Sequence, residues 1–207
     1  MNAINFYPRF DDLAEPVRIP AKPRLPKSLI PRRTHGRLLP TTAFIMRNLG
    51  EGGMVRSGFP GREELQGVSI ALAPEAKLWS FEPDEELFAY GVRDIELFQL
   101  DNVVCHKIAL SGRTGRSKNA DTDERFVKLD DVLSHRRRVS ILQFGAQDHD
   151  REALLGAQEI IHRWQPILMM EEFNKPRWIE SIFGGLGYRL TGFINQHSIF
   201  TATNISV

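Results

Sequence analysis

From residue 41 onward, short apolar segments of strand length alternate with segments that have the periodicity of amphipathic helices. This alternation is typical of a parallel sheet covered by helices, so the predicted fold class is α/β. Strands are expected at 54–57, 78–81, 103–110, 139–144 and 166–170. Helices are expected to follow them, at 61–73, 84–100, 132–135, 153–164 and 178–183. The polar stretch 111–124 is interpreted as a mobile surface loop.

The last two apolar segments, 188–194 and 198–203, are separated by only Asn195, Gln196 and His197. A parallel crossover needs about a dozen residues or more, so these segments are predicted to form an antiparallel hairpin. A mostly parallel sheet that ends in such a hairpin differs from the usual dinucleotide-binding fold.

Residues 1–40 differ in composition from the rest of the chain. They hold seven of the twelve prolines, and their eight basic and three acidic residues give a balance of +5. Proline removes a backbone donor and fixes φ, so regular structure is not expected there. The predicted organisation is a proline-rich basic arm at 1–40 and one folded domain at 41–207.

Composition excludes several classes of function. The chain has 207 residues and a formal charge of +1, so no global charge favours nucleic acid or an anionic membrane as a partner. A single cysteine, Cys105, allows no internal disulfide, and no His and carboxylate spacing indicates a metal site. No apolar run approaches the roughly 20 residues that span a bilayer. A soluble, cytoplasmic protein is expected.

Glu82 is the first candidate for ligand binding. It ends the apolar run from Leu78 to Phe81, precedes Pro83, and lies 24 positions after Gly58. A carboxylate at the end of the second strand of a nucleotide-binding sheet can accept hydrogen bonds from both hydroxyls of a ribose. Because a carboxylate at the tip of a buried strand has little structural purpose, Glu82 is predicted to bind an adenosine-containing cofactor.

Two further segments are expected to border the same crevice. The loop after the first strand has an incomplete glycine fingerprint, which equally fits a tight turn into a helix. Its residues are Ser57, Gly58, Phe59, Pro60 and Gly61. Ala109 and Leu110, at the tip of the third predicted strand, could form a wall for adenine, with ordinary packing as the alternative.

Seven segments, in their order and spacing, resemble the FkbM family of S-adenosylmethionine-dependent methyltransferases. They are Trp79–Asp84, Asp101–Val103, Ile108–Ser111, Val127–Leu133, Ile141–Phe144, Leu154–Ala157 and Gln165–Glu172, and the likeness spans roughly residues 52–203. The resemblance implies a Rossmann-like class I methyltransferase fold with a terminal antiparallel strand. It also implies S-adenosyl-L-methionine as cofactor and methyl transfer to an oxygen, commonly of a sugar, a glycolipid or a natural product.

The chain departs from the family at two places. Gly145 and Gln147 stand where members usually carry the acids of an Asp-x-Glu-Gly sequence, and Arg62 replaces a common acid in the glycine loop. A hydroxyl acceptor benefits from a nearby base. His149, with an ordinary pKa near 6.5, and Glu171, at the tip of the fifth strand, are the predicted catalytic residues.

Three functional hypotheses follow. The leading one is an O-methyltransferase that acts on a sugar-like or small-molecule hydroxyl. The alternative is a methyltransferase-like domain that has lost catalysis and serves as a binding or scaffold module, because Gly145 and Gln147 cannot act as acids. The third is a nicotinamide-dependent oxidoreductase, against which the incomplete glycine fingerprint and the hairpin both weigh. The acceptor and the oligomeric state are not predicted.

Overall fold

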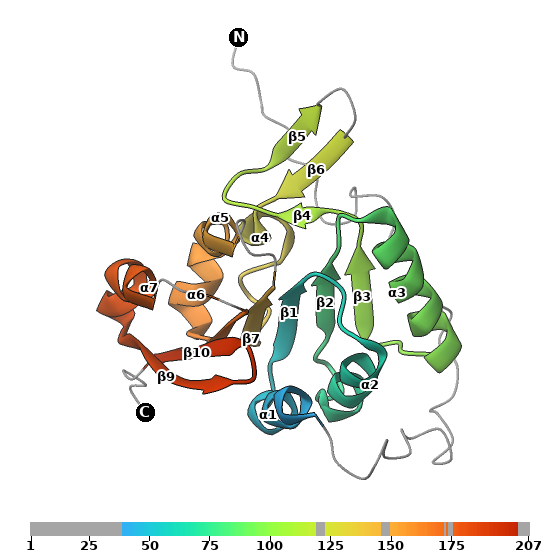
Figure 1. Cartoon of the computed structure of the whole chain (residues 1–207), viewed down its shortest axis with the longest axis horizontal. Helices are drawn as coiled ribbons and strands as arrows, with labels where there is room; N and C mark the ends of the chain where they lie inside the picture. The colour runs from blue at the N-terminus through green and yellow to red at the C-terminus, as the bar shows by residue number, and fades with distance from the viewer. Residues whose placement is uncertain (1–38, 119–122, 146–149, 172, 174–175, 203–207) are drawn as a thin grey trace.

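The computed structural model describes residues 39–118, 123–145, 150–171, 173 and 176–202. These residues form one seven-stranded sheet in the order β3-β2-β1-β7-β8-β10-β9 and one small sheet in the order β4-β6-β5 (Figure 1). The large sheet consists of β1 (Gly53–Ser57), β2 (Leu78–Phe81), β3 (Val103–His106), β7 (Val139–Phe144), β8 (Ile167–Glu171), β9 (Tyr188–Ile194) and β10 (His197–Ala202).

The strand pairing confirms the predicted α/β class and the terminal hairpin. Neighbouring strands from β3 to β8 are parallel, whereas β10 is antiparallel to both β8 and β9. Asn195 closes the β9–β10 turn with a left-handed backbone, at φ 51°. The strand order reverses between β1 and β7, which are hydrogen-bonded neighbours although β2 and β3 lie between them in sequence.

Helices cover both faces of the large sheet (Figure 1). One core cluster joins the sheet to α1 (Pro40–Asn48), α2 (Arg62–Ala71) and α3 (Glu85–Phe98). The other joins it to α4 (Leu129–Val132), α5 (Asp150–Leu155), α6 (Gln158–Trp164) and α7 (Pro176–Phe183). A short 3₁₀ turn, Gly184–Leu186, follows α7. Helix α1 was not predicted; Pro40 stands in its first turn, where a missing N–H costs nothing.

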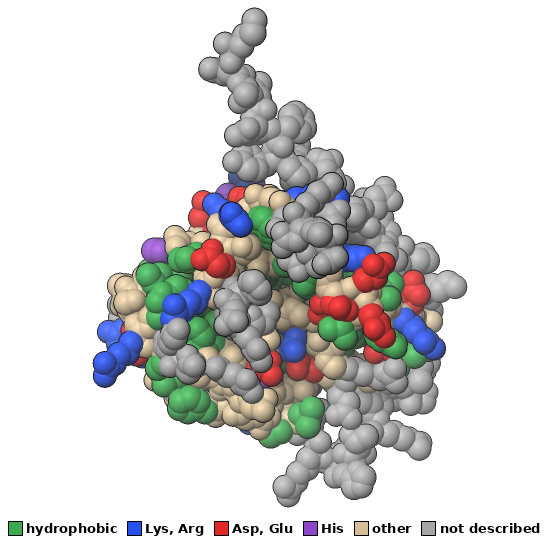
Figure 2. Space-filling model, turned by 45° about the horizontal axis from the view of Figure 1, so that its top comes forward, with side chains coloured by type: hydrophobic (Ala, Val, Ile, Leu, Met, Phe, Trp, Pro, Cys, Tyr) green, Lys and Arg blue, Asp and Glu red, His purple; other side chains and the backbone are tan. Residues whose placement is uncertain are grey.

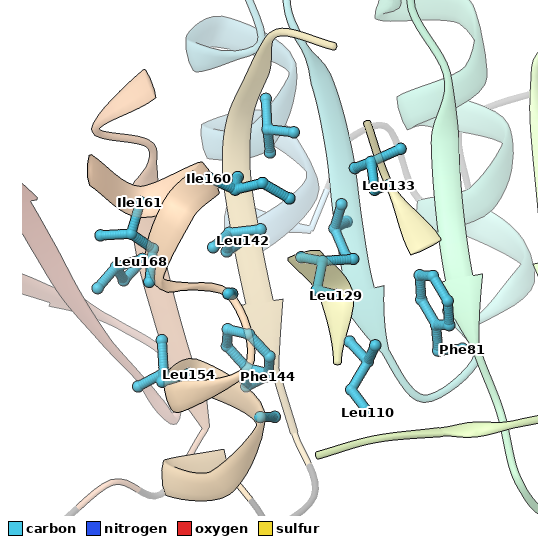
Figure 3. Packing of buried hydrophobic residues seen from close by; sticks show 14 of the residues in the cluster. Phe81, Leu110, Leu129, Leu133, Leu142, Phe144, Leu154, Ile160, Ile161 and Leu168 are labelled. Carbon is cyan, nitrogen blue, oxygen red and sulfur yellow. The ribbon is translucent and has the colours of Figure 1, made fainter. Parts of the chain in front are cut away.

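Strand β7 is buried on both faces. Leu142 and Phe144 belong to one core cluster, and Ile141 belongs to the cluster on the opposite side of the sheet. Figure 3 shows Phe144 with Leu154 and Leu110 among the side chains of the first cluster. A central strand of a doubly covered parallel sheet is apolar on both faces, which is why the sequence pattern identified it.

Two predictions about the segment 103–124 were wrong. The third strand ends at His106 and does not continue to residue 110, since β4 (Ala109–Leu110) pairs with β6 in the small sheet. The stretch interpreted as a loop contains β5 (Gly115–Lys118) and β6 (Asp123–Val127). These two strands are short and mostly polar, so they lack the alternation of apolar residues that marks a half-buried strand.

The helix predicted at 153–164 is also divided in two. It breaks between α5 and α6 at Gly156, where an added Cβ would lie 2.0 Å from the carbonyl oxygen of Ser111. Asp130 accepts hydrogen bonds from the N–H groups of Glu159 and Ile160, at 2.9 and 3.1 Å, and so caps α6. The helix expected at 132–135 lies earlier, at α4. The arm at 1–40 lies almost entirely outside the described residues.

Candidate functional site

The strand order reverses between β1 and β7, and the loops that follow these two strands lie beyond the carboxyl edge of the sheet. Ligands of open α/β sheets bind at such a reversal, because the loops that follow the two strands diverge to opposite faces. The loop after β1, the end of β2 and the end of β7 meet at this edge of the sheet. The site is therefore built from residues that follow these three strands.

Glu82 joins two of these loops through its carboxylate. Oε2 accepts a hydrogen bond from the N–H of Phe59 at 3.0 Å, and Oε1 accepts one from the N–H of Asp84 at 2.9 Å. The side chain is only 5% exposed. The expectation that this carboxylate has little structural purpose was therefore wrong, because it holds the β1 loop against the start of α3. Each oxygen keeps a second lone pair for a ligand.

The backbone of Gly58 allows this contact. Its φ of +84° is in the region that side chains rarely adopt, and an added Cβ would lie 3.9 Å from Oε2 of Glu82. The Gly58 N–H donates to the carbonyl of Phe81, and the Gly58 carbonyl accepts from Oγ of Ser80, both at 2.8 Å. The loop is thus pinned to β2 on both sides of its turn.

The ring of Phe59 packs on α3. An added Cβ at Gly91 would lie 2.3 Å from Cε2 of Phe59, so the glycine makes room for the aromatic ring. Phe59 consequently offers its N–H to Glu82 while its ring belongs to the core cluster beneath α2 and α3. Only the backbone N–H of Phe59 therefore takes part in the contact with Glu82.

His106 ends β3 beside this clamp. Its carbonyl accepts the N–H of Glu82 at 2.9 Å, and its ring stacks on Phe81 with centroids 5.2 Å apart. Burial lowers the pKa of His106 from 6.5 to about 4. The imidazole is therefore neutral at physiological pH in the folded protein.

The lowered pKa of His106 predicts a loss of stability in mild acid. Above pH 6.5 the ring is neutral in both the folded and the unfolded chain; between pH 6.5 and 4 only the unfolded chain binds the proton. Unfolding should become easier by about 3 kcal/mol over this window. Urea unfolding at pH 7 and at pH 4.5 measures this loss in the free energy of unfolding. Because His106→Gln has no group that titrates there, its free energy of unfolding should fall by about 2–3 kcal/mol less than that of the wild type over the same change of pH. An identical loss in both proteins would contradict the assignment.

The other predicted cofactor residues are distributed unevenly. Ser57 is buried at the end of β1, and Gly61 is an exposed residue just before α2. Leu110 is only 3% exposed and packs in the core, and Ala109 lies beside it in β4 rather than at the tip of β3. Leu110 therefore packs in the core, and the role of Ala109 and Leu110 as a wall for adenine stays a prediction. His149 lies outside the described residues.

A second polar cluster lies on the α2 side of the sheet near the same edge. It consists of Arg56 on β1, Glu64 on α2, Gln143 on β7, Glu171 on β8 and His197 on β10. Arg56 Nη1 lies 2.6 Å from Glu64 Oε1, and the side-chain amide nitrogen of Gln143 lies 3.1 Å from His197 Nε2. Residues 171 and 197 are direct partners across β8 and β10.

Sequence reasoning had singled out only part of this cluster. Glu171 was predicted as catalytic, whereas Arg56, Glu64 and Gln143 were not recognised. A polar residue inside an otherwise apolar strand was the available signal, because Arg56 and Gln143 interrupt the runs of β1 and β7. Their partners could not be deduced, since Gln143 and His197 are 54 positions apart.

Comparison with solved structures identifies the architecture. An FkbM methyltransferase from Methylobacillus flagellatus superposes with a TM-score of 0.59 at 16% sequence identity. The chain has the class I methyltransferase fold. The match covers 73% of this chain but 43% of that structure, so the chain spans less than half the length of this methyltransferase.

Other similar structures are methyltransferases as well. A putative rRNA methylase from Clostridium thermocellum has a TM-score of 0.48 at 14% identity, over 77% of this chain and 90% of that one. The O-methyltransferase TomG from Streptomyces achromogenes, solved with S-adenosylmethionine, has a TM-score of 0.46 at 12% identity, over 78% of each chain. No family model and no curated protein sequence matches this chain.

Two negative findings concern the part of the chain that the structure describes. No helix there is long and apolar enough to cross a membrane. No group of three or more histidine, cysteine or acidic side chains there could hold a metal ion.

Proposed function

We propose that this chain is an S-adenosylmethionine-dependent methyltransferase that methylates a hydroxyl of a sugar-like or other small molecule. The observation that carries the proposal is the Glu82 carboxylate, held by the N–H groups of Phe59 and Asp84 at the end of β2. It lies beside a glycine loop with a left-handed residue, next to the reversal of strand order. A glycine loop, a terminal acid and a reversal of strand order occur together at the edge of nucleotide-binding sheets where the cofactor binds.

The residues present fit such a cofactor. Glu82 is buried, ionisable, and has one lone pair on each oxygen beyond those used by the backbone, which suits the paired hydroxyls of a ribose. Gly58 leaves the loop surface without a side chain where a ligand would approach. S-adenosylmethionine, when bound, supplies a methyl group on a sulfonium. The chain's own residues then need to orient the acceptor, exclude water and take a proton.

Glu171 is the proposed proton acceptor within the described residues, and His149 keeps the same proposed role outside them. Glu171 ends β8 at the carboxyl edge of the sheet and is half-buried. Removing a proton by a positioned side chain contributes about 10²–10⁴-fold to the rate of such reactions.

Titration calorimetry with S-adenosylhomocysteine tests the cofactor assignment. The full chain should bind the nucleoside product with a dissociation constant in the micromolar range, about −8 kcal/mol, and should bind NAD far more weakly. No detectable binding of S-adenosylhomocysteine at millimolar concentration would contradict the proposal. Preference for NAD would favour the oxidoreductase hypothesis instead.

The second candidate function is a methyltransferase-like binding or scaffold module without catalysis. Gly145 favours it, because no acid follows β7 at that position. Transfer of a labelled methyl group to a panel of glycan and small-molecule hydroxyls separates the two functions. Turnover with any of these acceptors would exclude the scaffold module, and cofactor binding without turnover on any of them would favour it.

A further inference from the structure

The cluster of Arg56, Glu64, Gln143, Glu171 and His197 contains buried polar atoms that lack partners. Within the described residues, the amide oxygen of Gln143 and Nε of Arg56 are buried without a hydrogen bond, whereas the buried ring of His197 interacts with the backbone of Ile194. Gln143 is 1% exposed and His197 8% exposed. Burying such a group unpaired costs about 1–3 kcal/mol, so two in one cluster indicate a place where a polar ligand or water binds.

Gly145 lets Glu171 reach this cluster. An added Cβ at position 145 would lie 2.6 Å from Oε2 of Glu171, so the carboxylate fills the space of a side chain at the end of β7. The register supports this placement: Phe144 pairs with Met170, which puts the next residue of each strand side by side. The acid missing after β7 is thus matched by a carboxylate that β8 supplies at the same point.

The charged groups around His197 determine which side chain of the cluster can accept the proton of a bound hydroxyl. Burial lowers the pKa of His197; Glu171, Glu64 and a hydrogen bond with the backbone of Ile194 oppose this, and Arg56 lowers it further. The imidazole is therefore a neutral hydrogen-bonding group at neutral pH. Arg56 and Glu64 neutralise each other as an ion pair, so Glu171 is the carboxylate of the cluster that is left to accept a proton.

We propose that Gln143, Glu171 and His197 hold the hydroxyl of the methyl acceptor, and that Glu171 takes its proton. This assignment rests on the proposed methyltransferase function. As the hydroxyl oxygen bonds to the methyl carbon, the carbon–sulfur bond of the sulfonium donor breaks and sulfur keeps the electron pair. The hydroxyl proton passes to the Glu171 carboxylate, while the ring of His197, held in place by the amide nitrogen of Gln143, positions the oxygen.

The charge of the cluster selects the class of acceptor. With Arg56 and Glu64 paired, the carboxylate of Glu171 leaves a net negative charge beside the bound hydroxyl. Figure 2 shows acidic side chains gathered on one part of the surface, right of its centre. Asp84 and Glu86, at the start of α3, are exposed acids, and Glu85 between them pairs with Lys107. Like charges repel strongly when they are partly desolvated, so a neutral polyhydroxyl compound is favoured over a phosphorylated or carboxylated one.

The test uses the full chain saturated with S-adenosylhomocysteine and three probes: myo-inositol, methyl α-glucopyranoside and glucose 6-phosphate. The imidazole NMR signals of His197, assigned from His197→Gln, should shift on addition of a neutral polyol and not with the phosphate ester. With S-adenosylmethionine as donor, the wild type should methylate the same polyol. The Glu171→Gln variant should have a kcat at least about 100-fold lower than the wild type, and its KM for the polyol should stay within about threefold.

Two further variants complete the experiment. Gly145→Ala should displace the Glu171 carboxylate and lower kcat at least about tenfold without changing S-adenosylhomocysteine affinity, because the atom it meets is the end of a flexible side chain. Glu159→Gln changes an exposed acid on α6 and should leave every readout unchanged.

The outcomes separate this assignment from the proposed function. Failure to bind S-adenosylhomocysteine overturns the methyltransferase proposal itself. Binding of that nucleoside without any His197 shift from either polyol overturns the acceptor site. A polyol that binds without being methylated, or a Glu171→Gln variant that keeps more than a third of the rate, overturns the proton-accepting role.

Discussion

Glu82→Ala is expected to weaken binding of S-adenosylhomocysteine at least 100-fold. The substitution removes the carboxylate that we propose accepts hydrogen bonds from two ribose hydroxyls, and hydrogen bonds to a charged group contribute about 1.5–3 kcal/mol each. It also leaves the N–H groups of Phe59 and Asp84 without their partner, so the β1 loop loses its tie to the start of α3. Calorimetry gives the affinity, and urea unfolding gives the accompanying loss of stability, about 1–3 kcal/mol.

Glu85→Ala is the matched control for this experiment. Glu85 lies three positions further on, with its side chain 87% exposed in an ion pair with Lys107 at 3.1 Å. The Glu85→Ala substitution removes one carboxylate near Glu82 but leaves the hydrogen bonds of Glu82 to Phe59 and Asp84 intact. The affinity of this variant for S-adenosylhomocysteine should stay within threefold of the wild type. Affinity of Glu82→Ala within threefold of the wild type would contradict the ribose assignment, even if the variant were less stable.

Phe144→Ala is expected to destabilise the protein by about 3–5 kcal/mol, the usual cost of truncating a buried phenylalanine. The ring is completely buried in the core cluster that joins β7 to α5 and α6 (Figure 3). Truncation loses the transfer free energy of the ring and leaves a cavity that a sheet held on both sides cannot close. In a chain of this size the midpoint of thermal unfolding should fall by about 10 °C.

Phe193→Ala provides the comparison for Phe144. This phenylalanine lies on β9 with 70% of its surface exposed, so its truncation removes little buried area. Its free energy of unfolding should change by no more than about 0.5 kcal/mol. A loss below about 1 kcal/mol for Phe144→Ala would show that the cluster repacks around the missing ring.

The strands that were predictable each contain a run of adjacent buried apolar residues. Strands β1, β2, β7 and β8 lie in the middle of a covered sheet, so their apolar runs were readable without knowledge of their neighbours. The antiparallel pairing of β9 and β10 followed from the length of their connection alone, because three residues are too few for a parallel crossover. The mostly polar β5 and β6 lack that signal, since their stability comes from pairing with each other and with β4.

The candidate site likewise has residues that were predictable from local sequence and contacts that were not. Glu82 and Gly58 were predicted because a strand, its terminal acid and a glycine loop are each local in sequence. That the carboxylate clamps the backbone of Phe59 was not predictable, because the clamp joins residues 23 positions apart.

The sequence by itself determined the α/β class, the terminal hairpin and the acid that ends β2, because apolar periodicity and short connections act over a few residues. Only the tertiary structure decided that Gln143, Glu171 and His197 form one cluster and that Gly145 leaves room for a carboxylate from β8. These residues come from three different strands, and only the register of those strands in the sheet brings their side chains together.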